Sequence, residues 1–130
     1  MSYYLNRSTG LGFDQAVAAI TESLAAQGFG ILSDIDVAAT LKKKIDVDVP
    51  AYRILGACNP KLAHQALSAE NKIGTMLPCN VIVRADAGGE VEVAAIDPVS
   101  AMAVVDNPQL AAIAAQVREK LQTALDQMPA

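Results

Sequence analysis

Apolar side chains recur at helical spacing along much of the chain. Phe13, Val17, Ile20 and Leu24 follow one another at intervals of four, three and four residues, which places them on one face of a helix. Gly28 follows as a residue that can close this helix in a left-handed conformation. Similar stripes predict further helices from Val37 to about Ile45, from Pro60 to about Glu70 and from Pro108 to about Met128, with a short helical piece over 99–104. These stripes comprise Val37, Leu41 and Ile45 in the first; Leu62, Ala63, Ala66 and Leu67 in the second; and Leu110, Ile113, Val117, Leu121 and Leu125 in the last.

Polar residues mark the starts of these helices. Asn59-Pro60, Asp97-Pro98 and Asn107-Pro108 each pair a capping side chain with a proline, which is tolerated in the first turn because its missing N–H has no partner there. Asp36 is expected to cap the helix that begins at Val37. The helix boundaries are therefore predicted from capping chemistry as well as from periodicity.

The segments between the helices are typical of β-strands. Strands are predicted over 3–7, 29–35, 52–58, 80–84 and 90–96. The last two flank Asp86-Ala87-Gly88-Gly89, so they are expected to form a hairpin. One hairpin combined with helix-separated strands favours an α+β fold, with helices packed on one face of a largely antiparallel sheet. A doubly wound α/β fold is the alternative, but Ser8-Thr9-Gly10-Leu11-Gly12 lacks the Walker lysine and the third dinucleotide glycine.

Composition narrows the function classes. The chain has 130 residues, which suits a single domain over 1–130, and its apolar content of 52% excludes intrinsic disorder. A net charge of -4 and an aromatic content of 4% argue against nucleic acid as a partner. Only 18% of the residues are charged, against about 25% in a typical domain. We therefore expect part of the surface to be buried in a homodimer.

Two cysteines are too few for a disulfide framework. The sequence contains no apolar run long enough for a transmembrane helix, and its start shows no secretory signal. A cytoplasmic protein with reduced thiols and no membrane partner is therefore expected.

Three chemically capable residues surround the predicted strand end at 58. Cys58 directly precedes a helix N-terminus, where the helix dipole favours a negative charge such as a thiolate. His64 lies one turn into that helix, and Cys79 begins the next strand. Three interpretations stay open. Both cysteines could be buried core residues; Cys58, Cys79 and His64 or a carboxylate could bind a metal; or Cys58 could be a catalytic or redox thiol with His64 as its base.

Several motifs resemble one known family. They are Gly28-Phe29-Gly30-Ile31-Leu32, Leu55-Gly56-Ala57-Cys58-Asn59-Pro60, Leu77-Pro78-Cys79-Asn80-Val81 and Ile96-Asp97-Pro98. Together they resemble the uncharacterised family known as domain of unknown function 302. The resemblance implies a compact α+β fold of the TATA-binding-protein-like type, with a curved sheet, and a dimer. It implies no settled activity and no DNA binding.

The sequence therefore predicts a small cytoplasmic, homodimeric module that binds a small ligand or a metal near Cys58 and Cys79. A thiol-dependent enzyme or redox protein that uses Cys58 is the alternative. A third hypothesis is a structural or partner-binding protein in which both cysteines belong to the core. Neither the identity of a ligand nor that of a cofactor follows from these patterns.

Overall fold

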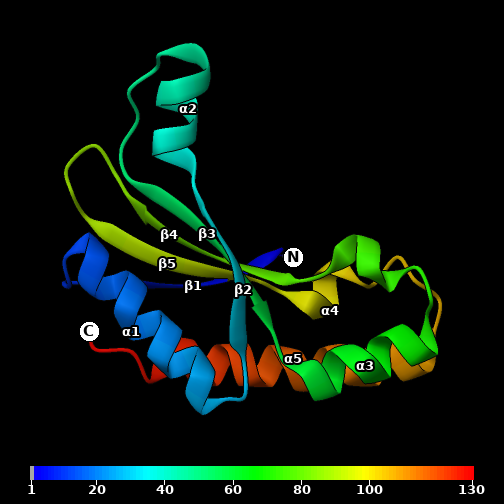
Figure 1. The fold of residues 1–130 in the computed structure, drawn as a ribbon. Helices are drawn as coiled ribbons and strands as arrows, with labels where there is room; N and C mark the ends of the chain where they lie inside the picture. The colour runs from blue at the N-terminus through cyan, green and yellow to red at the C-terminus, as the bar shows by residue number, and fades with distance from the viewer. Residues whose placement is uncertain (1) are drawn as a thin grey trace.

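The computed structural model describes residues 2–130, which form an antiparallel five-stranded sheet with helices on one side (Figure 1). The strands are β1 (Tyr4–Thr9), β2 (Gly30–Asp36), β3 (Tyr52–Cys58), β4 (Cys79–Ala85) and β5 (Val91–Ile96). Their order in the sheet is β1-β5-β4-β3-β2, so β1 and β2 are the edges. The predicted α+β fold, its strands and the β4–β5 hairpin are confirmed.

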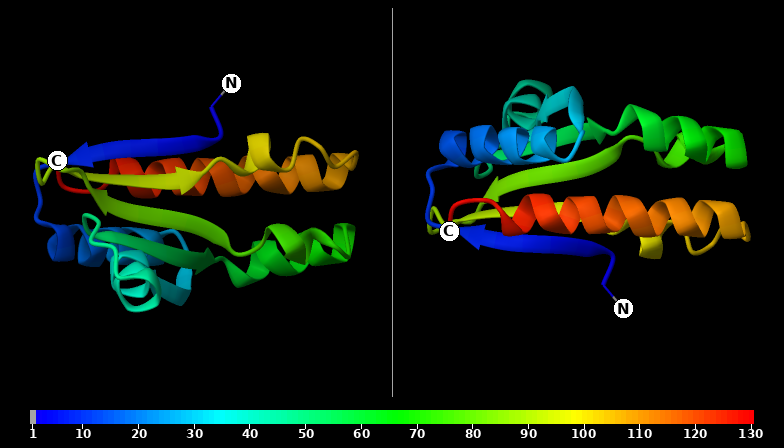
Figure 2. Two further views of the ribbon diagram at one scale, coloured as in Figure 1. Left: turned by 90° about the horizontal axis from the view of Figure 1, so that it is seen from above. Right: turned by 90° about the horizontal axis from the view of Figure 1, so that it is seen from below.

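The α-helices are α1 (Phe13–Ala26), α2 (Val37–Ile45), α3 (Pro60–Ala69), α4 (Pro98–Ala101) and α5 (Pro108–Asp126), and a short 3-10 helix, η1, spans Ile73–Met76. Four of the five α-helices described here, α2 to α5, begin directly after a predicted capping residue. Asp36, Asn59, Asp97 and Asn107 each accept a hydrogen bond from a backbone N–H of the first turn of the helix that follows. Seen from below, α1 and α5 lie across one face of the sheet, and α3 lies beside α5 past the end of β3 (Figure 2).

The core lies between this face and α1 and α5. Alternate residues of the strands point toward the helices, and the helical stripes pack against them. The fully buried large side chains include Leu55, Val81, Val83 and Val93 from the sheet and Ile20, Leu24, Leu121 and Leu125 from the helices. Alternation along the strands and helical spacing in α1 and α5 thus meet in one apolar layer.

Helix α2 departs from the prediction. Val37 and Leu41 are only half-buried, Ile45 is 63% exposed, and no residue of the helix is buried. Figure 1 shows α2 standing away from the other helices, beyond the ends of β2 and β3. The expectation that Val37, Leu41 and Ile45 face inward is wrong, because α1 and α5 already cover the helical face of the sheet.

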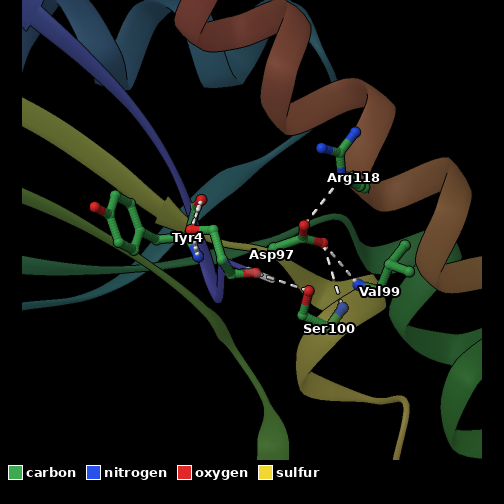
Figure 3. Close-up of polar contacts among 6 residues, drawn as sticks. Tyr4, Asp97, Val99, Ser100 and Arg118 are labelled. Carbon is green, nitrogen blue, oxygen red and sulfur yellow. Dashed lines mark hydrogen bonds and ion pairs between the residues drawn. The ribbon is translucent and has the colours of Figure 1, made fainter.

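One buried carboxylate ties the end of β5 to two helices (Figure 3). Asp97 accepts hydrogen bonds from the backbone N–H groups of Val99 (3.0 Å) and Ser100 (3.4 Å), and Nε of Arg118 in α5 donates to it at 3.1 Å. The hydroxyl of Ser100 also donates to the carbonyl of Ser2 at 2.9 Å. These contacts explain Asp97 and Arg118 as structural residues.

Among the residues described, no helix combines the length and the apolar character that a bilayer crossing requires.

Candidate functional site

The junction of β3 and α3 positions the first cysteine. Cys58 is the last residue of β3, and Asn59 caps α3 by accepting a hydrogen bond from the N–H of Leu62 at 3.3 Å. The amide group of Asn59 also donates to the carbonyl of Gln27 at 3.3 Å, which ties this turn to the end of α1. The strand end, the cap and the helix start are therefore held together by one side chain.

The second cysteine lies on the neighbouring strand. Cys79 begins β4 and is directly opposite Ala57 in the antiparallel register, so Cys58 is next to its partner. Both cysteines are free; Cys58 is half-buried and Cys79 is 7% exposed. The pairing of β3 with β4 therefore places the two cysteines at adjacent positions of the sheet. Because paired residues share a face, Cys79 lies on the face of Ala57 and Cys58 on the alternate face.

A cavity of about 310 Å³ opens beside the two cysteines. It lies between the ends of β3 and β4, helices α3 and α5, and the segments around η1 and α4. Its lining consists of Phe29, Leu32, Ala57, Cys58, Asn59, Leu62, Ala63, Ala66, Leu67, Gly74, Leu77, Pro78, Cys79, Met102, Ile113, Ala114 and Val117. The two cysteines thus border an open space instead of a fully packed core.

The chemistry of this cavity is uniformly apolar. Among the residues that the structure describes, no charged side chain lines it, and the amide of Asn59 already makes hydrogen bonds to two backbone groups. Leu32 and Leu67, 69% and 44% exposed, bring apolar surface to its solvent side. Neutral hydrocarbon groups gain free energy when they move from water into such a lining. A charged group would lose its hydration there and find no side chain of opposite charge.

The same cavity corrects the expected stripe of α3. Leu62 and Ala66 are buried as predicted, but Leu67 is exposed. Leu67 borders the cavity, where no neighbouring side chain covers it from outside. In α5, Ile113 and Val117 remain only half-buried for the same reason, while Leu110, Leu121 and Leu125 belong to the core.

Burial changes the pKa of the Cys79 thiol. Desolvation raises the pKa of Cys79 to about 11, and the nearby charge of Cys58 adds to this increase. Cys79 is therefore protonated at neutral pH and a poor nucleophile, since the thiolate is the reactive form.

His64 does not join the cysteines. Leu62 and Ala66 face the core, and His64 lies on the exposed side of α3, outside the cavity lining. Among residues 2–130, no three His, Cys, Asp or Glu side chains gather so that they could hold a metal. The predicted set of Cys58, Cys79 and His64 is therefore not assembled, because helical geometry directs His64 away from the strand ends.

Sequence reasoning missed several residues of the cavity. Met102, at the C-terminal end of α4, lines it from the predicted short helical piece over 99–104, and Gly74, in η1, lines it from a segment expected only as a connection. The segment 99–104 is mostly apolar but too short to show a helical period, so its sequence does not indicate this role. Ile113 and Val117 were identified as part of an apolar face, but not as the wall of a cavity.

The fold and the cavity define a class: an α+β protein whose antiparallel sheet, covered on one side by helices, ends at an apolar cavity with two free thiols. Within this class, the profile of the family "Domain of unknown function DUF302" matches residues 5–128, and the chain belongs to that family. The structure is similar to the crystal structure of an uncharacterized conserved DUF302 protein from Bacillus stearothermophilus, with a TM-score of 0.92 and 26% sequence identity. That match covers 98% of this chain and 99% of the other. No curated protein matches the chain.

Proposed function

We propose that the protein binds a small, neutral, apolar molecule in the cavity beside Cys58 and Cys79. The observation that carries this proposal is the cavity lining: among residues 2–130 it contains no charged side chain, and its one amide, that of Asn59, already makes one hydrogen bond through its nitrogen and one through its oxygen. A ligand with a buried charge would lose its hydration without compensation. A neutral ligand gains from leaving water.

The size of the cavity limits the ligand. Its volume of about 310 Å³ is at the lower end of the range of roughly 300–1,000 Å³ that is typical of small-molecule sites. The exposed Leu32 and Leu67 offer an apolar approach from solvent. A compact ring system or a short acyl group suits this space better than a long lipid.

The lining favours binding over thiol catalysis by Cys58. A catalytic thiol needs a base within hydrogen-bonding reach, and no imidazole or carboxylate lines the cavity. His64, the expected base, lies on the outer side of α3. The arrangement therefore supports a binding module more strongly than a thiol-dependent enzyme.

Titration with the neutral fluorescent probe N-phenyl-1-naphthylamine tests this function. We expect saturable binding of one probe per chain, with the increase in emission that accompanies transfer from water to an apolar site. In the variant Ala63→Phe, a half-buried lining residue is replaced by a side chain that fills part of the cavity. This variant is expected to lose most of the binding.

Ala115→Phe is the matched control, because it makes the same replacement on the exposed face of α5. It is expected to bind the probe like the original protein. Equal probe binding by all three proteins, or no saturable binding by the original one, would refute a ligand site in this cavity.

We also propose that the module is a homodimer. The arm, defined as α2 and the segment 46–51 that follows it, exposes Ile45, Val47 and Val49. The main contacts of α2 are with β2 and β3 alone, so its apolar side chains have little cover within the chain. An identical arm can cover them reciprocally about a two-fold axis, which also fits the low charge content.

Light scattering at micromolar concentration tests the dimer. Ile45→Asp would introduce a charge into the proposed contact and is expected to give a monomer. Val104→Asp, at a position that is 79% exposed and far from the arm in the sequence, should remain dimeric. A monomer mass for the original protein contradicts the proposal.

A cytoplasmic location is proposed as well. Both cysteines are free, which suits a reducing compartment. Cell fractionation that recovers the protein mainly outside the cytoplasm would contradict this.

A further inference from the structure

The face of the sheet turned away from α1 and α5 carries a hollow of about 390 Å³. Residues of β3, β4 and β5 line it, together with Tyr3 and Tyr4 at the start of the chain, and it shares no residue with the apolar cavity. Side chains alternate between the two faces along a strand. Arg84 of β4 and Glu92 of β5, which neighbour the buried Val83 and Val93, are therefore on the open face.

Strand pairing builds the hollow. At one end, Tyr52, Arg84 and Glu92 are paired in one row across β3, β4 and β5. At the other end, Tyr4 pairs with Ile96. Between these rows lies Ala94, whose small side chain is 7% exposed and leaves space between its larger neighbours.

All three tyrosines of the chain line this hollow, although aromatic residues make up only 4% of the sequence. Tyr3 and Tyr4 meet edge to face, with ring centroids 5.0 Å apart and an angle of 73° between the ring planes. Tyr52 approaches from the opposite end. A tyrosine offers an apolar ring and a polar hydroxyl at once, so the hollow is suited to a ligand with both kinds of surface.

An oriented carboxylate and a guanidinium add polar groups. Nη1 of Arg84 donates to Oε1 of Glu92 at 3.0 Å, and Nδ2 of Asn6 donates to Oε2 at 2.7 Å. Both carboxylate oxygens are thus anchored, while the side chain of Arg84 is 39% exposed and has further N–H groups to donate. Among residues 2–130, these are the two charged side chains in the lining, and together they carry no net charge.

The lining favours a neutral ligand that both donates and accepts hydrogen bonds. An anion would meet Glu92 and a cation would meet Arg84, whereas a hydroxyl group can donate to one and accept from the other. A nucleobase binds by stacking flat on aromatic rings. The edge-to-face arrangement of Tyr3 and Tyr4 provides no parallel pair of rings between which a base could lie.

We propose that this hollow binds the ring of a neutral sugar. The C–H groups on one face of the sugar pack against the tyrosine rings and Ile82. Its hydroxyl groups accept hydrogen bonds from Arg84 and donate to Glu92. The site is separate from the proposed apolar ligand, which occupies the cavity on the other side of the sheet end.

Tyrosine fluorescence tests the site in the unaltered protein. The chain has no tryptophan, and all its tyrosines line the hollow, so the intrinsic emission reports on this place. The full chain is titrated with the methyl α- and β-glycosides of glucose, galactose and mannose. We expect a saturable change with at least one of them and a dissociation constant of about 1 mM, since a ligand of this size makes few contacts. Saturation-transfer NMR should show contact through the ring C–H protons.

Variants separate the parts of the site. Ala94→Leu fills the centre of the hollow and should abolish saturable binding, whereas Ala115→Leu makes the same replacement on the exposed face of α5 and should leave it unchanged. Glu92→Gln preserves the shape of the side chain and removes its charge, and should weaken binding by about 10-fold or more. Circular dichroism checks that each variant is folded. If Ala94→Leu does not fold, Glu92→Gln and the NMR of the unaltered protein decide.

Several outcomes would overturn the sugar site. They are no saturable binding of any glycoside at concentrations well above 1 mM, full affinity in folded Ala94→Leu or in Glu92→Gln, and tighter binding of adenosine than of every glycoside. Displacement of the glycoside by N-phenyl-1-naphthylamine would also overturn it, because the two ligands would then share one site. Glycoside binding that persists in Ala63→Phe, with loss of the naphthylamine probe, supports two separate sites, and failure of either ligand alone leaves the other proposal standing.

Discussion

Helices α1 and α2 have similar apolar stripes, but only the stripe of α1 is buried. In α1, Ile20 and Leu24 are fully buried against the sheet. In α2, the corresponding stripe of Val37, Leu41 and Ile45 contains no buried residue. Helix α1 joins the two edge strands, β1 and β2, whereas α2 joins β2 to the interior strand β3. Both helices have an apolar stripe at helical spacing.

An apolar stripe at helical spacing does not by itself show that the stripe is buried. It identifies the face of a helix that is suited to burial, but the element that covers this face comes from the tertiary structure. Helix α1 packs on the sheet and α5, whereas α2 lies beyond the ends of β2 and β3 (Figure 1). The uncovered stripe of α2 is consistent with the proposed second copy of the chain.

The largest expected difference between the two helices is in the free energy of unfolding when a residue of each apolar stripe is truncated. Leu24→Ala leaves a cavity in the core and should lower the free energy of unfolding by about 2–5 kcal/mol. Ile45→Ala in dilute protein should change it by no more than about 0.5 kcal/mol, as is usual at exposed positions. Chemical denaturation monitored by circular dichroism measures both, and comparable losses would contradict the different burial of the two helices.

The position of Gly56 provides a test of close packing where β2 bulges against β3. The register of β2 shifts between Ile31 and Ser33, and a Cβ on Gly56 would lie 2.8 Å from Cγ of Pro78 and would also clash with the hydroxyl of Ser33. Gly56→Ala should destabilise the protein by about 1–3 kcal/mol, as overpacking typically does.

Gly30→Ala is the matched control, since no atom lies within 4 Å of the Cβ it would introduce. Its melting temperature should stay close to that of the original protein. If both variants melt together, the crowding around Gly56 is not a constraint on the fold.

Removal of the cap of α3 is expected to destabilise the protein more than removal of the cap of α2. Asn59 caps α3 and also bonds to the carbonyl of Gln27, so Asn59→Ala should cost about 1–2 kcal/mol. Asp36 caps only the arm, by accepting from the N–H of Ala39 at 2.9 Å. Asp36→Ala should therefore loosen α2 with a smaller effect on global unfolding. Hydrogen exchange of α2 amides, compared with the unfolding midpoint, separates the two outcomes.

An ion pair at the base of the arm should give the smallest effect. Hydrogen bonding to Arg53 lowers the pKa of Asp34 below its usual value. A lowered pKa in the folded state contributes stability above the unfolded value of about 4, and this contribution is lost as the pH falls below it. Because the pair is partly exposed, Asp34→Asn should cost about 0.2–1 kcal/mol at pH 7. The difference between the two proteins should shrink below about pH 4, and a constant difference would contradict the ion pair.

Much of the fold follows from local chemistry that the sequence displays. The residues Asp36, Asn59, Asp97 and Asn107 begin helices for the reason that identified them: each offers an oxygen to an N–H of the first turn that has no partner within the helix. The alternation of Val91 and Val93 with Glu92 likewise predicts which face of β5 is buried.

The candidate site was only partly predictable. The sequence places Cys58 at a strand end and Cys79 at the start of another strand, but their proximity depends on the pairing of β3 with β4. Met102 reaches the cavity through the position of α4, which no periodic signal specifies. His64 was predicted near Cys58 because it lies one turn into the helix that Cys58 precedes, but it lies on the exposed side of α3, outside the cavity lining.

Protection of Cys58 from alkylation tests the ligand cavity most directly. The rate of modification by iodoacetamide at pH 8 is followed by mass spectrometry with and without saturating N-phenyl-1-naphthylamine. The pKa of Cys79 is about 11, so only about one in a thousand of its thiols is ionised at this pH and the reaction reports on Cys58. We predict that the probe slows modification of Cys58 in proportion to its occupancy and fails to do so in Ala63→Phe. An unchanged rate in the original protein with the probe bound would contradict a ligand site beside the two cysteines.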